Sequence, residues 1–289
     1  MHSLLINADD FGLTPGINRA ILELHQAGAL TSATLMAAAP ACAEAVAMAL
    51  AHPSLGVGCH VVLVDGEPVA PPETIATLLD PASPRPAFHP TLGGFLRALL
   101  LGRIDPMHIE REAAAQIAKL RTLRIQPTHI DTHKHTHLFA RVLRPVLRAA
   151  QNHAVHAIRN PFEPAWSVQA TPHAPLARRV EVHLLRTLRT QFLRTVRASG
   201  LRTTQGSLGV LATGTLDATT LRSLLANLPA GTWELVCHPA HVDDALRATR
   251  TRLLASRQVE FEALLAVLAL NAHPHAIPAT ERIHFGHLP

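Results

Sequence analysis

Residues 3–17 read SLLINADDFGLTPGI, and this stretch decides the fold. Its apolar run, 3–8, predicts a buried β-strand. Two aspartates, Asp9 and Asp10, follow the run, and Thr14-Pro15 then supplies a helix cap with proline at the first helical position. A buried strand that leads through polar residues into a helix is the repeating unit of α/β proteins.

The same alternation continues along the chain. It predicts further strands at 31–37, 55–63, 128–132, 155–159, 207–211, 233–237 and 282–285, and helices at 41–51, 105–123, 138–151, 217–227 and 252–268. This order predicts a mostly parallel sheet, with helices on its faces or closed into a barrel. Because no repeat or linker is visible, we expect a single domain over 1–289, in which the Pro-rich stretch 66–90 is a lid or mobile loop.

Polar side chains follow the predicted strands, at the edge where α/β folds carry their active sites. Asp9 and Asp10 end the first strand, and His60, Arg159 and His238 lie at the ends of three others. Adjacent carboxylates repel each other, so they persist most easily if a cation neutralises one and the other transfers a proton. The alternatives are that the aspartates cap the next helix and that His60 is a hydrogen-bonded core residue.

Residues 128–137 carry the densest set of ligand-type side chains, THIDTHKHTH. If this run is extended, every second side chain lies on one face, which would then hold four imidazoles and one carboxylate. Such a face is costly without partners, and imidazole together with carboxylate suits a divalent metal. The alternative is a solvated polar edge strand.

Composition narrows the classes of function. The chain has a formal net charge of +5, but its arginines are scattered and it has no tyrosine, which argues against nucleic-acid binding. The three cysteines form no CxxC pair, which fits a reducing compartment. We see no apolar run long enough to span a membrane and no signal peptide, so the expected location is the cytoplasm.

Five segments of the chain form a recognisable series: NADDFG at 7–12, GCHVVL at 58–63, THIDTHKHTH at 128–137, RTTQG at 202–206 and CHPA at 237–240. In this order they resemble the YdjC-like carbohydrate deacetylases. More narrowly, they resemble the hopanoid-biosynthesis-associated branch of that family, often called HpnK. The resemblance covers most of the chain. It implies a single-domain α/β fold, a distorted (β/α) barrel like that of polysaccharide deacetylases.

The resemblance also implies a function. The expected activity is hydrolysis of the acetamide of an N-acetylated amino sugar, which releases acetate and a free amine. One divalent ion, which could be zinc, magnesium, manganese or cobalt, is expected to be held by Asp10, His60 and His133. The family also suggests a homodimer.

Other residues of the motifs receive roles from the same resemblance. Asp9 matches the general base and His238 the general acid, while Arg159 matches the residue that orients the base. Residues expected near the substrate, with less specific roles, are Asp131, His135, His137 and Phe11.

The segment 166–201 looks like an insertion, and most of it, 176–198, predicts one helix with an apolar stripe and many arginines. The alternative is an ordinary surface helix that packs on the barrel. A basic amphipathic helix, however, can contact anionic lipid or form a groove for a lipid tail. It would fit a glycolipid substrate, an N-acetylglucosaminyl hopanoid, and peripheral contact with the inner face of the membrane.

Two other functions compete with deacetylation. A phosphoesterase-like metal hydrolase would usually need a Gly-rich loop or clustered Arg and Lys beside the metal, and neither is visible. A non-catalytic metal-binding scaffold would need the ligands but neither Asp9 nor His238.

Overall fold

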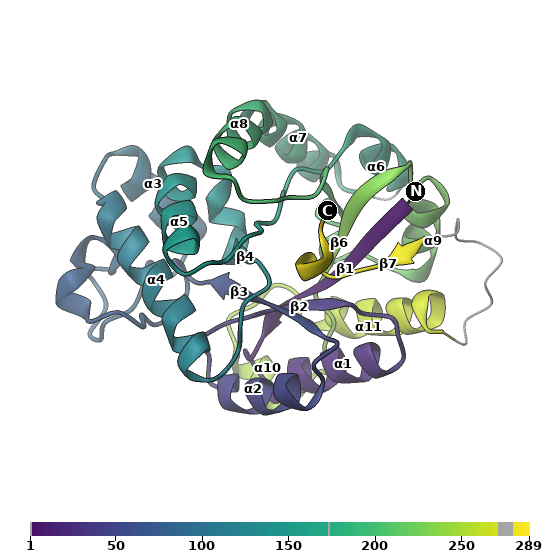
Figure 1. Cartoon of the computed structure of the whole chain (residues 1–289), viewed down its shortest axis with the longest axis horizontal. Helices are drawn as coiled ribbons and strands as arrows, with labels where there is room; N and C mark the ends of the chain where they lie inside the picture. The colour runs from purple at the N-terminus through teal and green to yellow at the C-terminus, as the bar shows by residue number, and fades with distance from the viewer. Residues whose placement is uncertain (1, 173, 271–279) are drawn as a thin grey trace.

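Seven parallel strands form one curved sheet in the part of the chain that this computed structural model describes, residues 2–172, 174–270 and 280–289. The spatial order is β4-β3-β2-β1-β6-β5, and β7 also pairs with β1 (Figure 1). The strands are β1 (His2–Phe11), β2 (Ser32–Leu35), β3 (Gly56–Val61), β4 (Ile130–Thr132), β5 (Ser207–Leu208), β6 (Gly231–Cys237) and β7 (Glu281–Arg282).

Strand β1 is the centre of the sheet. It pairs with β2 on one side and with β6 on the other, so that Asn7 lies opposite both Ser32 and Val236. From Ser3 to Phe11 every residue of β1 is buried. A strand covered on both faces needs a continuous apolar run, which explains why this stretch of sequence does not alternate.

Helices surround the sheet (Figure 1). Helices α1, α2, α10 and α11 lie along the lower side of the view, α3, α4 and α5 at the left, and α6, α7 and α8 along the top. Their bounds are α1 (Pro15–Gln26), α2 (Cys42–Ala51), α3 (Leu92–Leu100), α4 (Pro106–Thr122), α5 (Ala140–Asn152), α6 (Ala165–Ala170), α7 (Leu176–Leu185), α8 (Arg189–Ser199), α9 (Ala218–Ala226), α10 (Asp244–Ala248) and α11 (Ala255–Leu268).

The sheet continues beyond β4 only as isolated bridges. Ile130 bridges to Ile158, and the neighbouring Ala157 bridges to Arg202, both in parallel. The strand predicted at 155–159 is therefore reduced to single bridges, and the strand predicted at 207–211 to the two residues of β5. The curled parallel sheet is thus an irregular half-barrel. This confirms the predicted fold class, a single-domain α/β fold with a distorted barrel.

The expectation of an extended face along residues 128–137 is wrong. Strand β4 ends at Thr132, and a 3-10 helix, η3 (His133–Leu138), follows it. Lys134 and His135 adopt left-handed φ angles of 55° and 52°, which a regular strand does not contain. The Thr132 hydroxyl accepts a hydrogen bond from the His137 backbone N–H at 3.0 Å and closes this turn. As a result, the histidines turn across the end of the sheet instead of lining one strand.

The Pro-rich stretch 66–90 packs onto the barrel. It forms two 3-10 helices, η1 (Pro72–Thr74) and η2 (Ala76–Leu78), and buries Ile75, Leu78 and Phe88 in the main core. Glu112 of α4 accepts hydrogen bonds from the backbone of residues 69 and 70 and fixes the start of the stretch.

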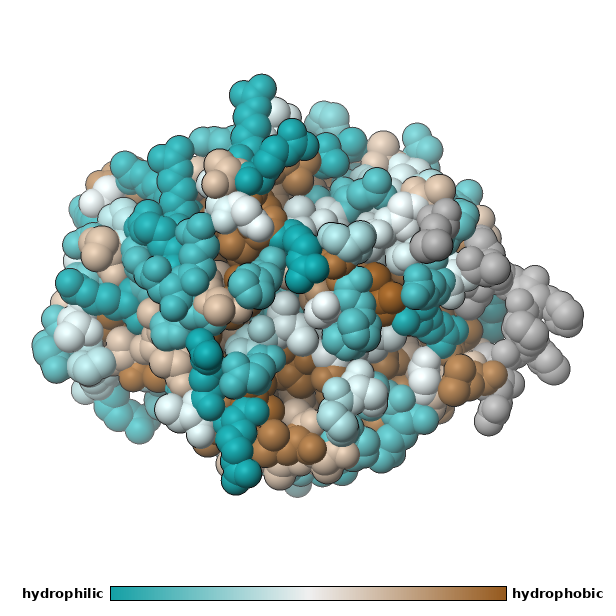
Figure 2. Space-filling model, viewed as in Figure 1, coloured by the Kyte–Doolittle hydropathy of each residue, from teal (hydrophilic) through white to brown (hydrophobic). Residues whose placement is uncertain are grey.

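The helix predicted at 176–198 is interrupted. Helices α7 and α8 are joined by a 3-10 turn, η4 (Arg186–Leu188). Phe192 and Val196 of α8 are buried, whereas Leu176 and Leu184 of α7 are exposed by 77% and 61%. Hydrophilic side chains project over these helices at the top of the molecule (Figure 2). Across the described residues, we find no helix with the length and apolar character needed to cross a membrane.

Candidate functional site

A bulge in β1 brings the two adjacent carboxylates to the same end of the sheet. The pairing of β1 with β2 shifts register between Ala8 and Phe11, and Asp10 has a left-handed φ of 65°. In a regular strand the side chains of Asp9 and Asp10 would point to opposite faces. The bulge turns both of them towards the site, and aspartate tolerates this backbone conformation better than most residues.

Asp10, His60 and His133, the ligands that the family resemblance implied, form a group of metal-ligand type. Asp10 Oδ1 lies 3.3 Å from His133 Nδ1 and 3.6 Å from His60 Nε2, and the two nitrogens are 3.3 Å apart. Asp10 Oδ1 is buried and has no hydrogen-bond partner. Tetrahedral zinc with bonds of about 2.0–2.1 Å would separate its ligands by about 3.3 Å. These donors therefore fit one small divalent ion.

Asp131 fixes the ring of His60. Its Oδ1 lies 2.7 Å from His60 Nδ1, at the buried side of the ring. A proton held on Nδ1 by this carboxylate leaves the lone pair of Nε2 facing Asp10 and His133. Burial alone would lower the pKa of His60, but the carboxylates of Asp131, Asp9 and Asp10 together outweigh burial and raise that pKa to about 9. Binding of a metal ion at Nε2 would therefore release a proton from the ring.

Arg159 is fully buried and pairs with three carboxylates. Its Nη1 and Nη2 donate to the two oxygens of Asp9 at 2.9 and 2.7 Å, Nη1 also donates to Asp131, and Nε donates to Glu234 at 2.7 Å. The guanidinium fork thus fixes the plane of the Asp9 carboxylate. Although burial acts in the opposite direction, Arg159 holds the pKa of Asp9 far below its usual range, so Asp9 stays ionised.

His238 faces Asp9 from the end of β6. Its Nε2 lies 3.7 Å from Asp9 Oδ2, and its ring is partly exposed. The His238 backbone N–H donates to Glu260 at 2.6 Å. A carboxylate and an imidazole that face each other beside a metal-ligand group could move protons on opposite sides of one substrate bond.

The residues expected near the substrate do not form one set. His135 is partly exposed, and its Nδ1 is buried without a hydrogen-bond partner. His137 is buried, with Nδ1 at 2.7 Å from the Thr132 hydroxyl and Nε2 at 3.3 Å from the Arg159 carbonyl. Phe11 is fully buried in the core, and the oxygens of Asp131 contact His60 and Arg159. These three side chains are fully enclosed by other protein groups, so the structure gives them a role in holding neighbouring residues in place.

Three buried charged residues of the site were missed by sequence reasoning: Glu234, Arg257 and Glu260. Glu234 is the single carboxylate in the apolar run of β6, and that contrast was a usable signal. Arg257 and Glu260 lie on α11, and charged residues are common in most of the predicted helices. Nothing in the spacing of that helix distinguishes them from surface residues.

The chain is similar in sequence to known proteins. Residues 3–269 match the family described as YdjC-like protein. Carbohydrate deacetylases from Brevibacillus brevis and Geobacillus stearothermophilus are each 38% identical over 161 and 169 residues, or 55% and 58% of this chain. These alignments span 59% and 61% of the two relatives, less than two thirds of their length.

A third relative and one solved structure align along nearly the whole chain. The carbohydrate deacetylase of Thermoanaerobacter pseudethanolicus is 29% identical over 260 residues, which is 90% of this chain and 89% of the relative. The crystal structure of a candidate cellobiose-phosphate cleavage protein from Enterococcus faecalis superposes with a TM-score of 0.72. It is 25% identical, and the superposition covers 92% of this chain and 91% of that one.

Proposed function

We propose that this chain, which belongs to the YdjC-like protein family, is a metal-dependent carbohydrate N-deacetylase. The substrate would be an N-acetylated amino sugar, and the products acetate and a free amine. The relatives named carbohydrate deacetylase support this reading. The observation that carries it is the convergence of three metal-ligand atoms with an ionised carboxylate, Asp9, that an imidazole, His238, faces at 3.7 Å.

Asp10, His60 and His133 would hold the ion, and their donor set suits zinc, cobalt, manganese or magnesium. A divalent ion bound there would lower the pKa of a water molecule and polarise the acetamide carbonyl. Asp9, its plane fixed by Arg159, accepts the proton of the attacking water.

The departing nitrogen needs an acid, because an amine leaves badly as its anion. His238 is suited to protonate it, since the ring is partly exposed and lies across from Asp9. Base and acid thus come from different strands, β1 and β6, which are neighbours in the sheet.

The competing functions have less support. A phosphoesterase with two metals would need a second set of ligands, but the other candidate group, Asp9, His60 and Asp131, shares His60 with the first. Arg159 also pairs with both carboxylates of that group. A scaffold that only binds metal would not need the Asp9–His238 pair.

Acetate release from N-acetylglucosaminyl substrates tests the proposal. We expect release by the metal-loaded chain, none after treatment with a chelator, and recovery when a divalent ion is added back. Asp9→Asn and His238→Ala should each lower kcat by about 100- to 10,000-fold, the usual contribution of a general base or acid. A loaded, folded chain that releases no acetate but cleaves phosphate esters would overturn the proposal in favour of the phosphoesterase.

We further propose that the amino sugar is the head group of an N-acetylglucosaminyl hopanoid and that α7 contacts the inner face of the membrane. Leu176, Val180 and Leu184 are exposed and follow one another at i, i+4 and i+8, so they form one apolar stripe. Arg186 follows this stripe in the chain, on η4, and Arg194 lies on α8. An apolar stripe beside arginines is the pattern of helices that lie on anionic bilayers.

Sedimentation with anionic liposomes tests the membrane contact. Replacing the three apolar residues of α7 by serine should abolish binding, while replacing Leu100 and Leu101, which are exposed elsewhere, should leave it unchanged. Equal binding by both variants would discard the membrane contact without affecting the deacetylase proposal. We also propose that the chain forms a homodimer in the cytoplasm, and sedimentation velocity would detect the dimer.

A further inference from the structure

Helix α11 carries two buried charged side chains, Arg257 and Glu260, one turn apart. Arg257 contacts the metal-ligand half of the site at Asp10, and Glu260 contacts the half that carries His238. We propose that Arg257 and Glu260 are positioning residues: Arg257 sets the orientation of Asp10, and Glu260 sets the position of His238. The inference rests on the deacetylase function proposed above and adds a helix, outside all of the sequence motifs, to the machinery of that site.

Arg257 holds one oxygen of Asp10. Its Nη2 donates to Asp10 Oδ2, and the arginine side chain is 2% exposed. Because Oδ2 is occupied in this way, Oδ1 is left to face the nitrogens of His60 and His133. The Nε and Nη1 atoms of Arg257 are buried without a hydrogen-bond partner. Among the described residues, Asp10 is therefore the hydrogen-bond partner that this guanidinium holds in place.

Asp10 needs such a restraint more than an ordinary ligand does. It lies in the β1 bulge with a φ of 65°, next to a second carboxylate that is itself fixed by Arg159. A free carboxylate in this position could turn and offer both oxygens to one ion. The bond from Arg257 favours binding through a single oxygen, which keeps a coordination position open for water and substrate.

Glu260 holds the other half of the site through the backbone. Its Oε2 accepts from the His238 N–H at 2.6 Å, and its Oε1 accepts from the Gly214 N–H at 3.3 Å. The carbonyl of Arg257 in turn accepts from the Ala240 N–H at 3.2 Å. The segment that carries His238 therefore rests on the first turns of α11 at two points.

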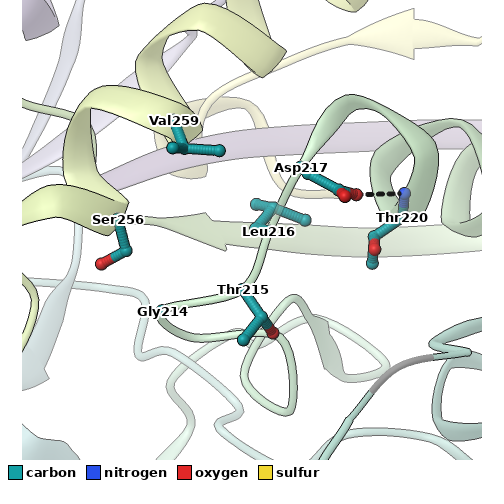
Figure 3. Close-up of a pocket in the computed structure, with 7 residues that line it drawn as sticks. All are labelled: Gly214, Thr215, Leu216, Asp217, Thr220, Ser256 and Val259. Carbon is teal, nitrogen blue, oxygen red and sulfur yellow. Dashed lines mark hydrogen bonds between the residues drawn. The ribbon is translucent and has the colours of Figure 1, made fainter.

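The neighbouring positions on α11 face elsewhere and supply a control. Ser256 and Val259 line a groove of about 390 Å³, together with the loop that precedes α9 (Figure 3). In that loop Asp217 caps α9 by accepting from the Thr220 N–H. The predicted site residues are not part of this lining, so Val259→Ala changes α11 without touching the site.

Cobalt substitution tests the Arg257 half without any substrate. Four- and five-coordinate Co²⁺ absorbs visible light more strongly than six-coordinate Co²⁺. Arg257→Met should let Asp10 bind through both oxygens and lower the molar absorption roughly twofold or more, or abolish cobalt binding by a folded chain. Arg257→Lys should restore part of the wild-type spectrum, and Val259→Ala all of it. A wild-type spectrum and affinity in Arg257→Met overturns this half.

Kinetics test the Glu260 half. In Glu260→Gln one of the two backbone N–H groups loses its acceptor, so His238 shifts relative to Asp9. We expect kcat to fall about 10- to 100-fold with little change in KM, while the cobalt spectrum stays that of the wild type. Unchanged kcat overturns this half.

The two proposals fail differently. If the wild-type chain binds cobalt but releases no acetate, the deacetylase function fails, and the Glu260 half fails with it. The cobalt spectra still decide the Arg257 half in that case. If the wild type is active and both variants behave like Val259→Ala, only the positioning inference fails.

Discussion

At the scale of single residues, the site depends on one buried arginine. Arg159 has no exposed surface, and its guanidinium pairs with Asp9, Asp131 and Glu234. Burying a charge is costly unless its hydrogen bonds are complete, and removing one partner of a buried pair usually costs about 3–5 kcal/mol. Burial also raises the pKa of Glu234 to about 7 even beside this guanidinium. The cluster is thus held together by the fork geometry of the arginine.

We predict that Arg159→Lys destabilises the chain although it keeps the charge. An ammonium cannot reproduce the planar fork that pairs with three carboxylates, so the free energy of unfolding should fall by about 3 kcal/mol. Urea denaturation measures the change. The control is Arg148→Lys at the partly exposed pair with Glu110, where the change should stay below about 1 kcal/mol. Equal losses in the two variants would contradict a special role for the fork.

A second prediction concerns the pH dependence of stability through Glu163. This carboxyl is buried and accepts from the Ser167 hydroxyl and from the Leu211 N–H at 2.5 Å. Burial raises its pKa from 4.5 to about 7. The folded chain therefore binds this proton more tightly than the unfolded chain does. Its contribution to stability is complete below pH 4.5 and is lost as the pH rises through 7.

Glu163→Gln should remove that contribution, because an amide does not titrate. The difference in unfolding free energy, wild type minus variant, should fall by roughly 2 kcal/mol between pH 5 and pH 8. Taking this difference cancels the titration of all other groups. Exposed Glu73 provides the matched substitution, Glu73→Gln, which should show no such trend. A pH-independent difference for Glu163→Gln would show that its carboxyl is not protonated in the fold.

At the scale of elements, apolar runs predicted the central strands well because those strands are buried on both faces. The predictions at 3–8, 31–37, 55–63 and 233–237 correspond to β1, β2, β3 and β6. The short helices α3, α6 and α10 were not predicted, since five to nine residues give too little periodicity. The turn at His133–Leu138 could not be foreseen, because two non-glycine residues there adopt left-handed φ angles.

The rule that places active sites at strand ends identified the convergent residues. The family resemblance implied that Asp10, His60 and His133 hold one ion, although 50 and 73 residues separate them along the chain. The rule itself pointed to Asp10 and His60. It could not predict Arg257, whose contact with Asp10 spans 247 residues and comes from a helix. Contacts of that kind follow from packing of the whole fold, and no local pattern records them.

The close packing of β3 gives a third prediction. A Cβ on Gly58 would lie 2.3 Å from Cε1 of His129, and that ring is stacked on Phe285 at 3.7 Å between centroids. The ring cannot retreat, so Gly58→Ala should lower the free energy of unfolding by about 1–3 kcal/mol. Urea denaturation measures it. Gly93→Ala in α3, where a Cβ meets nothing within 4 Å, should be neutral or stabilising. If Gly58→Ala matched it, His129 would have to be free to move.

At the scale of the whole molecule, the ligand group exists only in the folded chain. Asp10 ends β1, His60 lies in β3, and His133 follows β4, so the group requires the order β4-β3-β2-β1 to be assembled first. In the unfolded chain these side chains are far apart. Any ion that binds the group therefore stabilises the fold as well.

Metal removal should accordingly lower stability as well as activity. Zinc at 100 times its Kd should raise the free energy of unfolding of the metal-free chain by about 2.7 kcal/mol. His133→Ala should lose this increment, because it removes a ligand whose ring is only partly buried, so little packing is lost. His52→Ala, outside the group, should keep the increment and thereby account for zinc bound at other histidines. If zinc stabilises His133→Ala as much as the wild type, the ion binds elsewhere, and Asp10, His60 and His133 are not its ligands.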